Sequence, residues 1–136
     1  MAQINFDKTL HKTHEWLHDV KNYLELEDEE KTYLITKAVL HTLRDRLTIE
    51  EVFQFGEQLP MLMKGFYYER YKPANKPIKF KKAEFIKAIF LRMPETKISP
   101  EEAIAAVTQM IKMRISNGEI KDIIAVLPKD LKELFR

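Results

Sequence analysis

Cysteine is absent from this sequence of 136 residues. The absence excludes disulfide bridges, thiol nucleophiles and cysteine-ligated zinc, and it fits a reducing cytoplasm. The first residues, MAQINFDKTLHK, lack the apolar core of a signal peptide. No apolar run approaches the roughly 18 residues that a membrane span needs. We therefore expect a cytoplasmic protein without a membrane partner.

Glycine and proline are also scarce, at 3 and 6 residues. Strong helix formers (Ala, Leu, Ile, Met, Glu and Lys) dominate instead. Apolar residues make up 45% and charged residues 32%, which is typical of a globular domain. The net charge of +2 is too small to indicate a nucleic-acid or membrane partner by itself. The composition predicts one all-α domain over residues 1–136.

Five short motifs mark helix starts. Thr48, Ser99 and Ser116 are each followed three residues later by a glutamate, which is the spacing of a capping box. The pairs Leu59-Pro60 and Leu127-Pro128 end one helix and open the next, because proline pushes the preceding residue out of the helical conformation. Together with the apolar periodicity, these signals predict eight helices, over residues 5–25, 30–47, 49–58, 60–71, 82–93, 100–115, 117–126 and 128–135.

The second half of the sequence repeats the first after a shift of 68 residues. We predict two tandem four-helix repeats, 1–72 and 78–136, with a linker at 73–77. Because the helices are short and sharply broken, we expect a compact orthogonal bundle around one shared core rather than a long up-down bundle. The identical pairs are Ala38/Ala106, Val39/Val107, Arg46/Arg114, Glu51/Glu119, Leu59/Leu127, Pro60/Pro128 and Lys64/Lys132.

Four segments carry a family resemblance: THEWL, AVLHTLRDRL, QLPMLMKGFYYE and AVLPKDLKELF. They resemble the bacterial family called domain of unknown function 2267, over nearly the whole chain. The resemblance implies an all-helical fold and no assigned activity. His14, Glu15 and Trp16 match the family pattern, whereas a histidine at position 18 is not part of it.

The stretch HEWLH, with His14, Glu15 and His18, has the spacing of a zinc-protease motif. A helical wheel places His14 at the rim of the apolar stripe and His18 toward solvent, whereas a zinc enzyme needs both imidazoles and a third ligand in a cleft. We therefore predict no catalytic residue, metal or cofactor, and keep a metal-dependent hydrolase only as an alternative. The predicted apolar stripe of this helix is Phe6, Leu10, Thr13, Leu17, Val20 and Leu24.

Residues 64–87 are rich in lysine and aromatic side chains. Cations that bind phosphates and rings that stack on bases are the groups that nucleic-acid grooves use. A solvated loop between the repeats gives the same pattern. Binding of an anionic ligand or nucleic acid is thus an alternative function. Its candidate residues are Lys72, Lys76, Lys79, Lys81 and Lys82.

The fourth predicted helix is apolar around most of its circumference, with Met61, Tyr68 and Tyr71 outside the face that its counterpart in the second repeat shares. Such a helix lies either at the centre of the core or against a partner. Our leading hypothesis is a non-enzymatic module that binds a protein partner or associates with itself as a homodimer. These three residues are its predicted partner contacts. His41 shows no pattern that indicates a partner.

Overall fold

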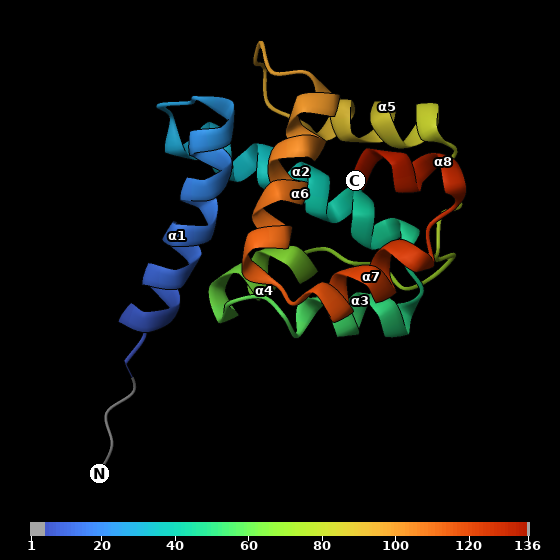
Figure 1. Cartoon of the computed structure of the whole chain (residues 1–136), viewed down its shortest axis with the longest axis horizontal. Helices are drawn as coiled ribbons and strands as arrows, with labels where there is room; N and C mark the ends of the chain where they lie inside the picture. Colours follow the sequence, from blue (N-terminus) through green and yellow to red (C-terminus); the bar gives the residue numbers. More distant parts are fainter. Residues whose placement is uncertain (1–4, 136) are drawn as a thin grey trace.

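The computed structural model describes residues 5–135, which form eight α-helices and a terminal 3₁₀ helix, without a β-strand among these residues (Figure 1). The predicted all-α class with about eight helices is therefore confirmed. No helix within residues 5–135 has both the length and the apolar character to cross a membrane. The elements are α1 (Asp7–Leu24), α2 (Glu29–Arg46), α3 (Ile49–Gly56), α4 (Met61–Tyr68), α5 (Lys82–Arg92), α6 (Pro100–Arg114), α7 (Asn117–Ala125), α8 (Lys129–Lys132) and the 3₁₀ helix Glu133–Phe135.

The predicted caps lie at the observed helix starts. The Thr48 hydroxyl accepts a hydrogen bond from the backbone N–H of Glu51 at 3.3 Å, and the Glu51 carboxylate accepts from the N–H of Thr48 at 2.8 Å. Ser99 and Ser116 likewise accept from the N–H three residues later, at the starts of α6 and α7. The sequence predicted all three caps. Of these three, only the Thr48 cap also has the reciprocal bond, in which the backbone N–H of the cap residue donates to the glutamate carboxylate.

Helix α2 occupies the centre of the fold. It contacts α1, α4, α5 and α6, and α6 crosses it steeply in Figure 1. Helix α1 packs alongside α6, and α3 lies beside α4 and α7. The central helix is thus α2, and α4 lies at the periphery with one buried face. This arrangement leaves the start of α4 open to solvent.

One buried apolar cluster draws side chains from every helix. In α1, however, the apolar stripe differs from the prediction at its start. Phe6 and Leu10 are 62% and 47% exposed, whereas Trp16 is buried. The first turns of α1 project toward solvent (Figure 1) and contact the start of α4 through Thr9 and Leu62, so the side chains of Phe6 and Leu10 are only partly covered. A helical wheel gives the direction of a side chain but not where the neighbouring helix ends.

Several helix bounds of the two halves coincide after the predicted shift, whereas the starts of α1 and α5, and of α2 and α6, do not. Helices α1 and α5 end at Leu24 and Arg92, and α2 and α6 end at Arg46 and Arg114, in both cases 68 residues apart. Helices α3 and α7 begin 68 residues apart at Ile49 and Asn117. Such coincidence is what a duplication requires, and the two-repeat organisation itself stays a prediction.

Gly56, the last residue of α3, lies where α3 meets the end of α4. A side chain at this position would collide with the Tyr68 ring, 2.6 Å from its Cζ atom, and would come within 3.2 Å of the Tyr67 ring. A methyl group on Gly65, which is exposed in the middle of α4, would meet nothing within 4 Å. The two glycines thus differ in packing rather than in secondary structure.

We predict that Gly56→Ala lowers the free energy of unfolding by about 1 to 3 kcal/mol, because the added methyl group overpacks the contact with Tyr68. The matched change Gly65→Ala should raise it by about 0.5 to 1 kcal/mol, because alanine favours the helix interior. Denaturant unfolding measures both. Adding Tyr68→Leu to Gly56→Ala should recover part of the loss. Equal effects of the two single changes would contradict the role of close packing.

Candidate functional site

The stretch HEWLH is split between the two sides of α1: His14 and His18 are exposed, Glu15 is half-buried and Trp16 is buried. His14, at the rim of the predicted apolar stripe, is therefore more exposed than expected. The Glu15 carboxylate accepts contacts from His11, with 2.7 Å between Nε2 and Oε1, and from Arg114, with 3.4 Å between Nη1 and Oε2. His18 lies 3.7 Å from Glu29. Glu15 thus joins α1 to a cation on α6, and it lines an open pocket of about 290 Å³ together with His11, His14, His18, Asp19 and Arg114.

The guanidinium of Arg114 already binds the carboxylates of Glu15 and Asp19, which a metal ion at this stretch would need as ligands. Arg114 binds both oxygens of Asp19, at 2.7 and 3.1 Å, and these bonds raise the pKa of Arg114. Across residues 5–135, no group of three or more His, Asp or Glu side chains is placed to hold a metal ion. The metal-dependent hydrolase therefore gains no support from the structure. Arg114 bridges two helices, which the repeat pattern alone did not indicate.

The three predicted partner residues have different surroundings. Met61 is 66% exposed at the start of α4. Tyr68 and Tyr71 are half-buried: the Tyr68 ring packs 4.9 Å from that of Tyr67, and the Arg44 guanidinium lies 5.1 Å above the Tyr71 ring. Among the three, Met61 is the most accessible, and the tyrosines mainly contact the chain's own side chains. Their role as partner contacts stays a prediction.

Four large apolar side chains are exposed where α1 meets the start of α4. They are Phe6, Leu10, Met61 and Leu62, and we call them the α1–α4 edge. The Thr9 hydroxyl accepts a hydrogen bond from the Leu62 N–H at 3.1 Å. Because the cap residue Pro60 makes no side-chain bond at this end of α4, Thr9 supplies a partner from another helix. The bond holds the two parts of the edge together.

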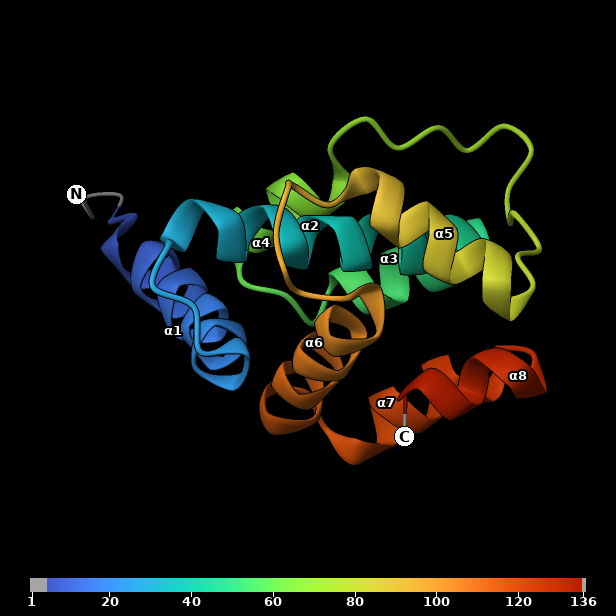
Figure 2. The ribbon, with the colours of Figure 1, turned by 90° about the horizontal axis from the view of Figure 1, so that it is seen from above.

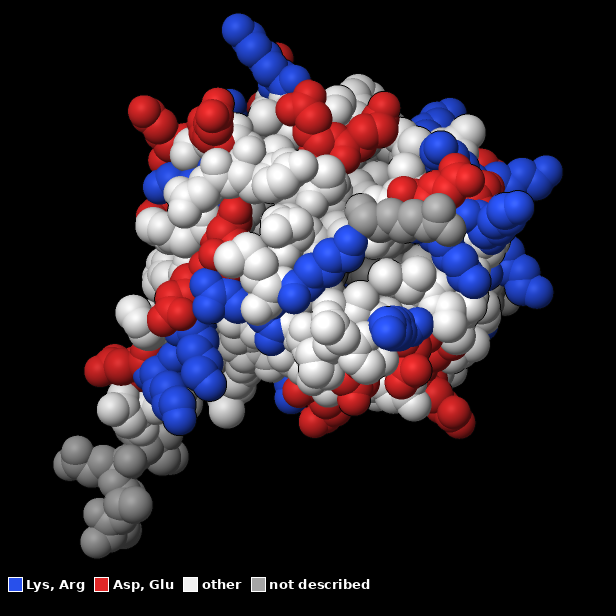
Figure 3. Space-filling view, in the orientation of Figure 1, with Lys and Arg blue, Asp and Glu red and all other residues white. Residues whose placement is uncertain are grey.

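The five lysines of the predicted basic segment lie along the loop between α4 and α5 and at the start of α5. This loop runs along one side of the molecule (Figure 2), held to the end of α2 by a 2.7 Å hydrogen bond from the Ile78 N–H to the Asp45 carbonyl. Lys82 lies 3.9 Å from Glu133. On the face shown in Figure 3, basic and acidic side chains are interspersed. Anion binding by these lysines stays a prediction.

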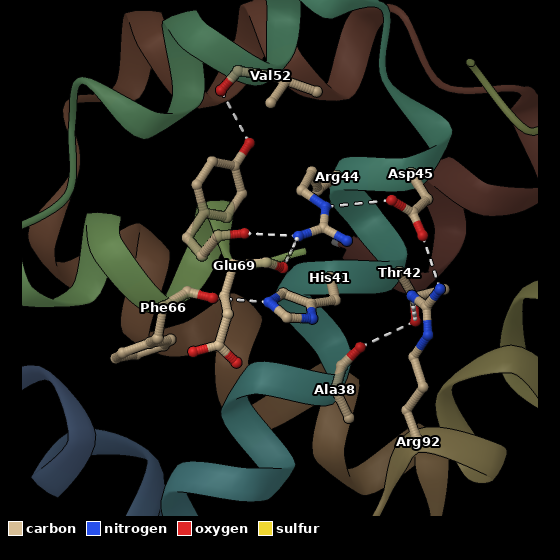
Figure 4. Close-up of polar contacts among 10 residues, drawn as sticks. Ala38, His41, Thr42, Arg44, Asp45, Val52, Phe66, Glu69 and Arg92 are labelled. Atoms are coloured by element: carbon tan, nitrogen blue, oxygen red, sulfur yellow. Dashed lines mark hydrogen bonds and ion pairs between the residues drawn. The ribbon is translucent and has the colours of Figure 1, made fainter. Parts of the chain in front are cut away.

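The structure reveals a buried ionic group that the sequence reasoning missed, which we call the Asp45 cluster (Figure 4). The carboxylate of Asp45 accepts from Arg44 Nε at 3.1 Å through one oxygen and from Arg92 Nη2 at 2.6 Å through the other. Arg92 also donates to the Thr42 hydroxyl at 2.9 Å. Arg44 and Asp45 are both 4% exposed. The cluster joins α2 to α5, which belong to different predicted repeats.

Arg44 extends the cluster to the end of α4. Its Nη1 donates to the backbone carbonyls of Tyr67 and Glu69, at 2.8 and 3.0 Å. The last carbonyls of a helix have no partners within it, so a buried guanidinium satisfies them. The Tyr67 hydroxyl in turn donates to the Val52 carbonyl of α3 at 2.8 Å. A chain of bonds therefore runs from α5 through α2 and α4 to α3.

His41 lies beside this cluster, with 2.7 Å between Nε2 and the Phe66 carbonyl (Figure 4). The carbonyl accepts, so Nε2 carries the proton. Burial, together with the cations Arg44, Lys37 and Arg92, lowers the pKa of His41 to about 4, against the opposing effect of the bond to Phe66. His41 is therefore a neutral imidazole at pH 7.

A cavity of about 260 Å³ opens next to His41, between α2, the residues after α4, and α5. At its wall, Lys37 and Glu69 form a 2.6 Å ion pair that lowers the pKa of the Glu69 carboxyl and raises that of Lys37. The cavity lies at the junction of the two predicted repeats. Its lining residues are Leu34, Lys37, Ala38, His41, Glu69, Arg70 and Arg92.

We expect Asp45→Asn to lower the free energy of unfolding by about 3 kcal/mol or more, because it leaves buried Arg44 without its counter-charge. The same change at Asp19, whose partner Arg114 is partly exposed, should cost about 1 kcal/mol or less. Thermal or denaturant unfolding of the two variants provides the comparison. A small loss at Asp45 would show that the cluster contributes little to stability.

The lowered pKa of His41 predicts a pH dependence of stability. Between pH 6.5 and about 4 the unfolded chain binds a proton at His41 that the folded chain does not, so folding weakens as the pH falls through this window. Allowing for the partial exposure of the ring, we expect His41 to account for a loss of about 1 to 2 kcal/mol between pH 7 and pH 4. His41→Gln should flatten this part of the profile, and an unchanged slope would contradict the assignment.

Comparison with known proteins gives a family and no activity. No curated protein matches the chain in sequence. Residues 13–134 match the family described as an uncharacterized conserved protein (DUF2267), which confirms the resemblance of the four sequence segments. Because this match covers nearly the whole sequence, the chain belongs to the DUF2267 family.

Proposed function

We propose that the protein is a non-enzymatic binding module that associates with a second copy of itself through the α1–α4 edge. The observation that carries this proposal is the exposure of Phe6, Leu10, Met61 and Leu62 on either side of the Thr9–Leu62 hydrogen bond. Single exposed apolar residues are ordinary on protein surfaces, but adjacent large ones mark interaction sites. Of the three partner contacts predicted from the sequence (Met61, Tyr68 and Tyr71), the α1–α4 edge includes Met61.

Burial of the α1–α4 edge against a second copy would contribute substantially to the free energy of association. Covering one large apolar side chain contributes about 1.5 to 3 kcal/mol relative to leaving it in water. Phe6 and Met61, both more than 60% exposed, have the most surface to lose. Aromatic residues and methionine are enriched in interface cores, where a rigid ring and a flexible thioether side chain complement one another.

A second copy suits this edge because the first turns of α1 carry exposed charges of both signs. Asp7, Lys8 and Lys12 are exposed on the same first turns of α1 as the edge itself. In a two-fold symmetric contact the same patch meets itself in the opposite direction, so an acidic group of one copy can face a basic group of the other. A border of one sign would repel its copy.

We expect sedimentation equilibrium over a micromolar concentration series to show reversible dimerisation. Met61→Glu should weaken the dimer about tenfold or more, because it places a charge in the apolar contact. Leu91→Glu is the matched control: Leu91 is 71% exposed on α5, away from the edge, and its replacement should leave the dimer unchanged.

Circular dichroism will establish that both variants keep the helical fold, which we expect because neither side chain is in the core. A monomer at all concentrations contradicts self-association. A dimer that Leu91→Glu disrupts and Met61→Glu does not would place the interface on α5 and would overturn the assignment to the α1–α4 edge.

A further inference from the structure

The cavity beside His41 is surrounded by more cations than anions. Lys37 and Arg44 of α2, Arg70 after α4 and Arg92 of α5 lie on or directly behind its wall, against the carboxylates Asp45 and Glu69. Both carboxylates are engaged: Asp45 binds Arg44 and Arg92, and Glu69 binds Lys37. The cations around the cavity therefore leave an excess of positive charge at this site, which adds to burial in lowering the pKa of His41.

We propose that this cavity binds a small phosphate-type oxyanion, held by Arg70, Arg92 and His41. The site is independent of the α1–α4 edge and lies between the two predicted repeats. Arg92 directs one donor each to Thr42 and Asp45, and the guanidinium has five N–H donors in all, so it has further N–H groups to offer. Arg70 lines the cavity and belongs to neither the Asp45 cluster nor the core.

His41 selects among oxyanions by its protonation. Since Nε2 donates to the Phe66 carbonyl, the neutral ring keeps an unprotonated Nδ1, which accepts a hydrogen bond and lies away from that carbonyl (Figure 4). Hydrogen phosphate carries an O–H that can donate to Nδ1. Sulfate has nearly the same shape but carries no proton at neutral pH. Its oxygen lone pairs would therefore face the lone pair of Nδ1 and be repelled by it. The site therefore favours phosphate over sulfate.

The size of the cavity agrees with a small ligand. Its volume of about 260 Å³ falls below the roughly 300 to 1,000 Å³ of sites that enclose organic ligands of drug size. It has room for an inorganic phosphate ion or for the phosphoryl end of a monoester. The two differ at neutral pH, because a monoester dianion carries no proton and must take one up to bind His41 in the same way.

The test is isothermal titration of the full chain with inorganic phosphate, sulfate and methyl phosphate at pH 7.5 and constant ionic strength. Phosphate should bind about tenfold more tightly than sulfate, the factor expected from one hydrogen bond to a charged group. Repeating the titrations in buffers of different ionisation enthalpy reports proton uptake. Methyl phosphate should take up a proton on binding and inorganic phosphate should not.

Arg70→Gln and Lys87→Gln form a matched pair, since each removes one positive charge from an exposed side chain and only Arg70 lines the cavity. Arg70→Gln should weaken phosphate binding about tenfold, and Lys87→Gln should leave it nearly unchanged. Equal losses in the two variants would show a diffuse charge effect and overturn the proposal. So would sulfate binding as tightly as phosphate, or no binding of phosphate at about 10 mM.

Discussion

The fold depends on one buried carboxylate, that of Asp45, which two arginines share. Removing a carboxylate and a guanidinium from water carries a large desolvation cost, which is offset only where the geometry satisfies both groups. Here each carboxylate oxygen of Asp45 accepts a hydrogen bond from a different arginine. Arg44 also donates through Nη1 to the backbone carbonyls at the end of α4. The backbone carbonyl of Asp45 meanwhile anchors the loop after α4 through Ile78. Helices α2, α4 and α5 are therefore connected through two neighbouring residues of α2, Arg44 and Asp45, in addition to their shared apolar core.

The same cluster creates the electrostatic character of the cavity. Its arginines are fixed by bonds to Asp45, so they cannot move away from His41, and their charge favours the neutral imidazole. A neutral histidine among cations is a hydrogen-bond acceptor in a positive field, which few other side chains provide at pH 7. Structural stability and the proposed recognition of an oxyanion thus have the same physical origin.

The sequence predicted the helices well because their ends are set by local chemistry. The Thr48 cap, the Ser99 cap and the Leu-Pro breaks act through neighbours a few residues away, and each lies where a helix begins or ends. The Asp45 cluster depends instead on contacts between residues 47 apart, and a helical wheel assigns charged residues to solvent. The predicted repeat also offers no guide, since the counterparts of Arg44 and Asp45, 68 residues later, are the exposed Lys112 and Met113. The available signal was a pair of adjacent opposite charges, Arg44 and Asp45, in the last turn of α2.

Helix α4 connects the two surfaces on which function is proposed. Its first turn carries Met61 and Leu62, and its start is held by the Thr9 hydroxyl of α1. Its last carbonyls are held by Arg44, and the cavity begins at the next residues, Glu69 and Arg70. An α-helix of eight residues is only about 12 Å long, and this one is fixed at both ends. Its exposed side chains are consequently presented on a rigid support, so little conformational entropy remains to be lost when a partner covers them.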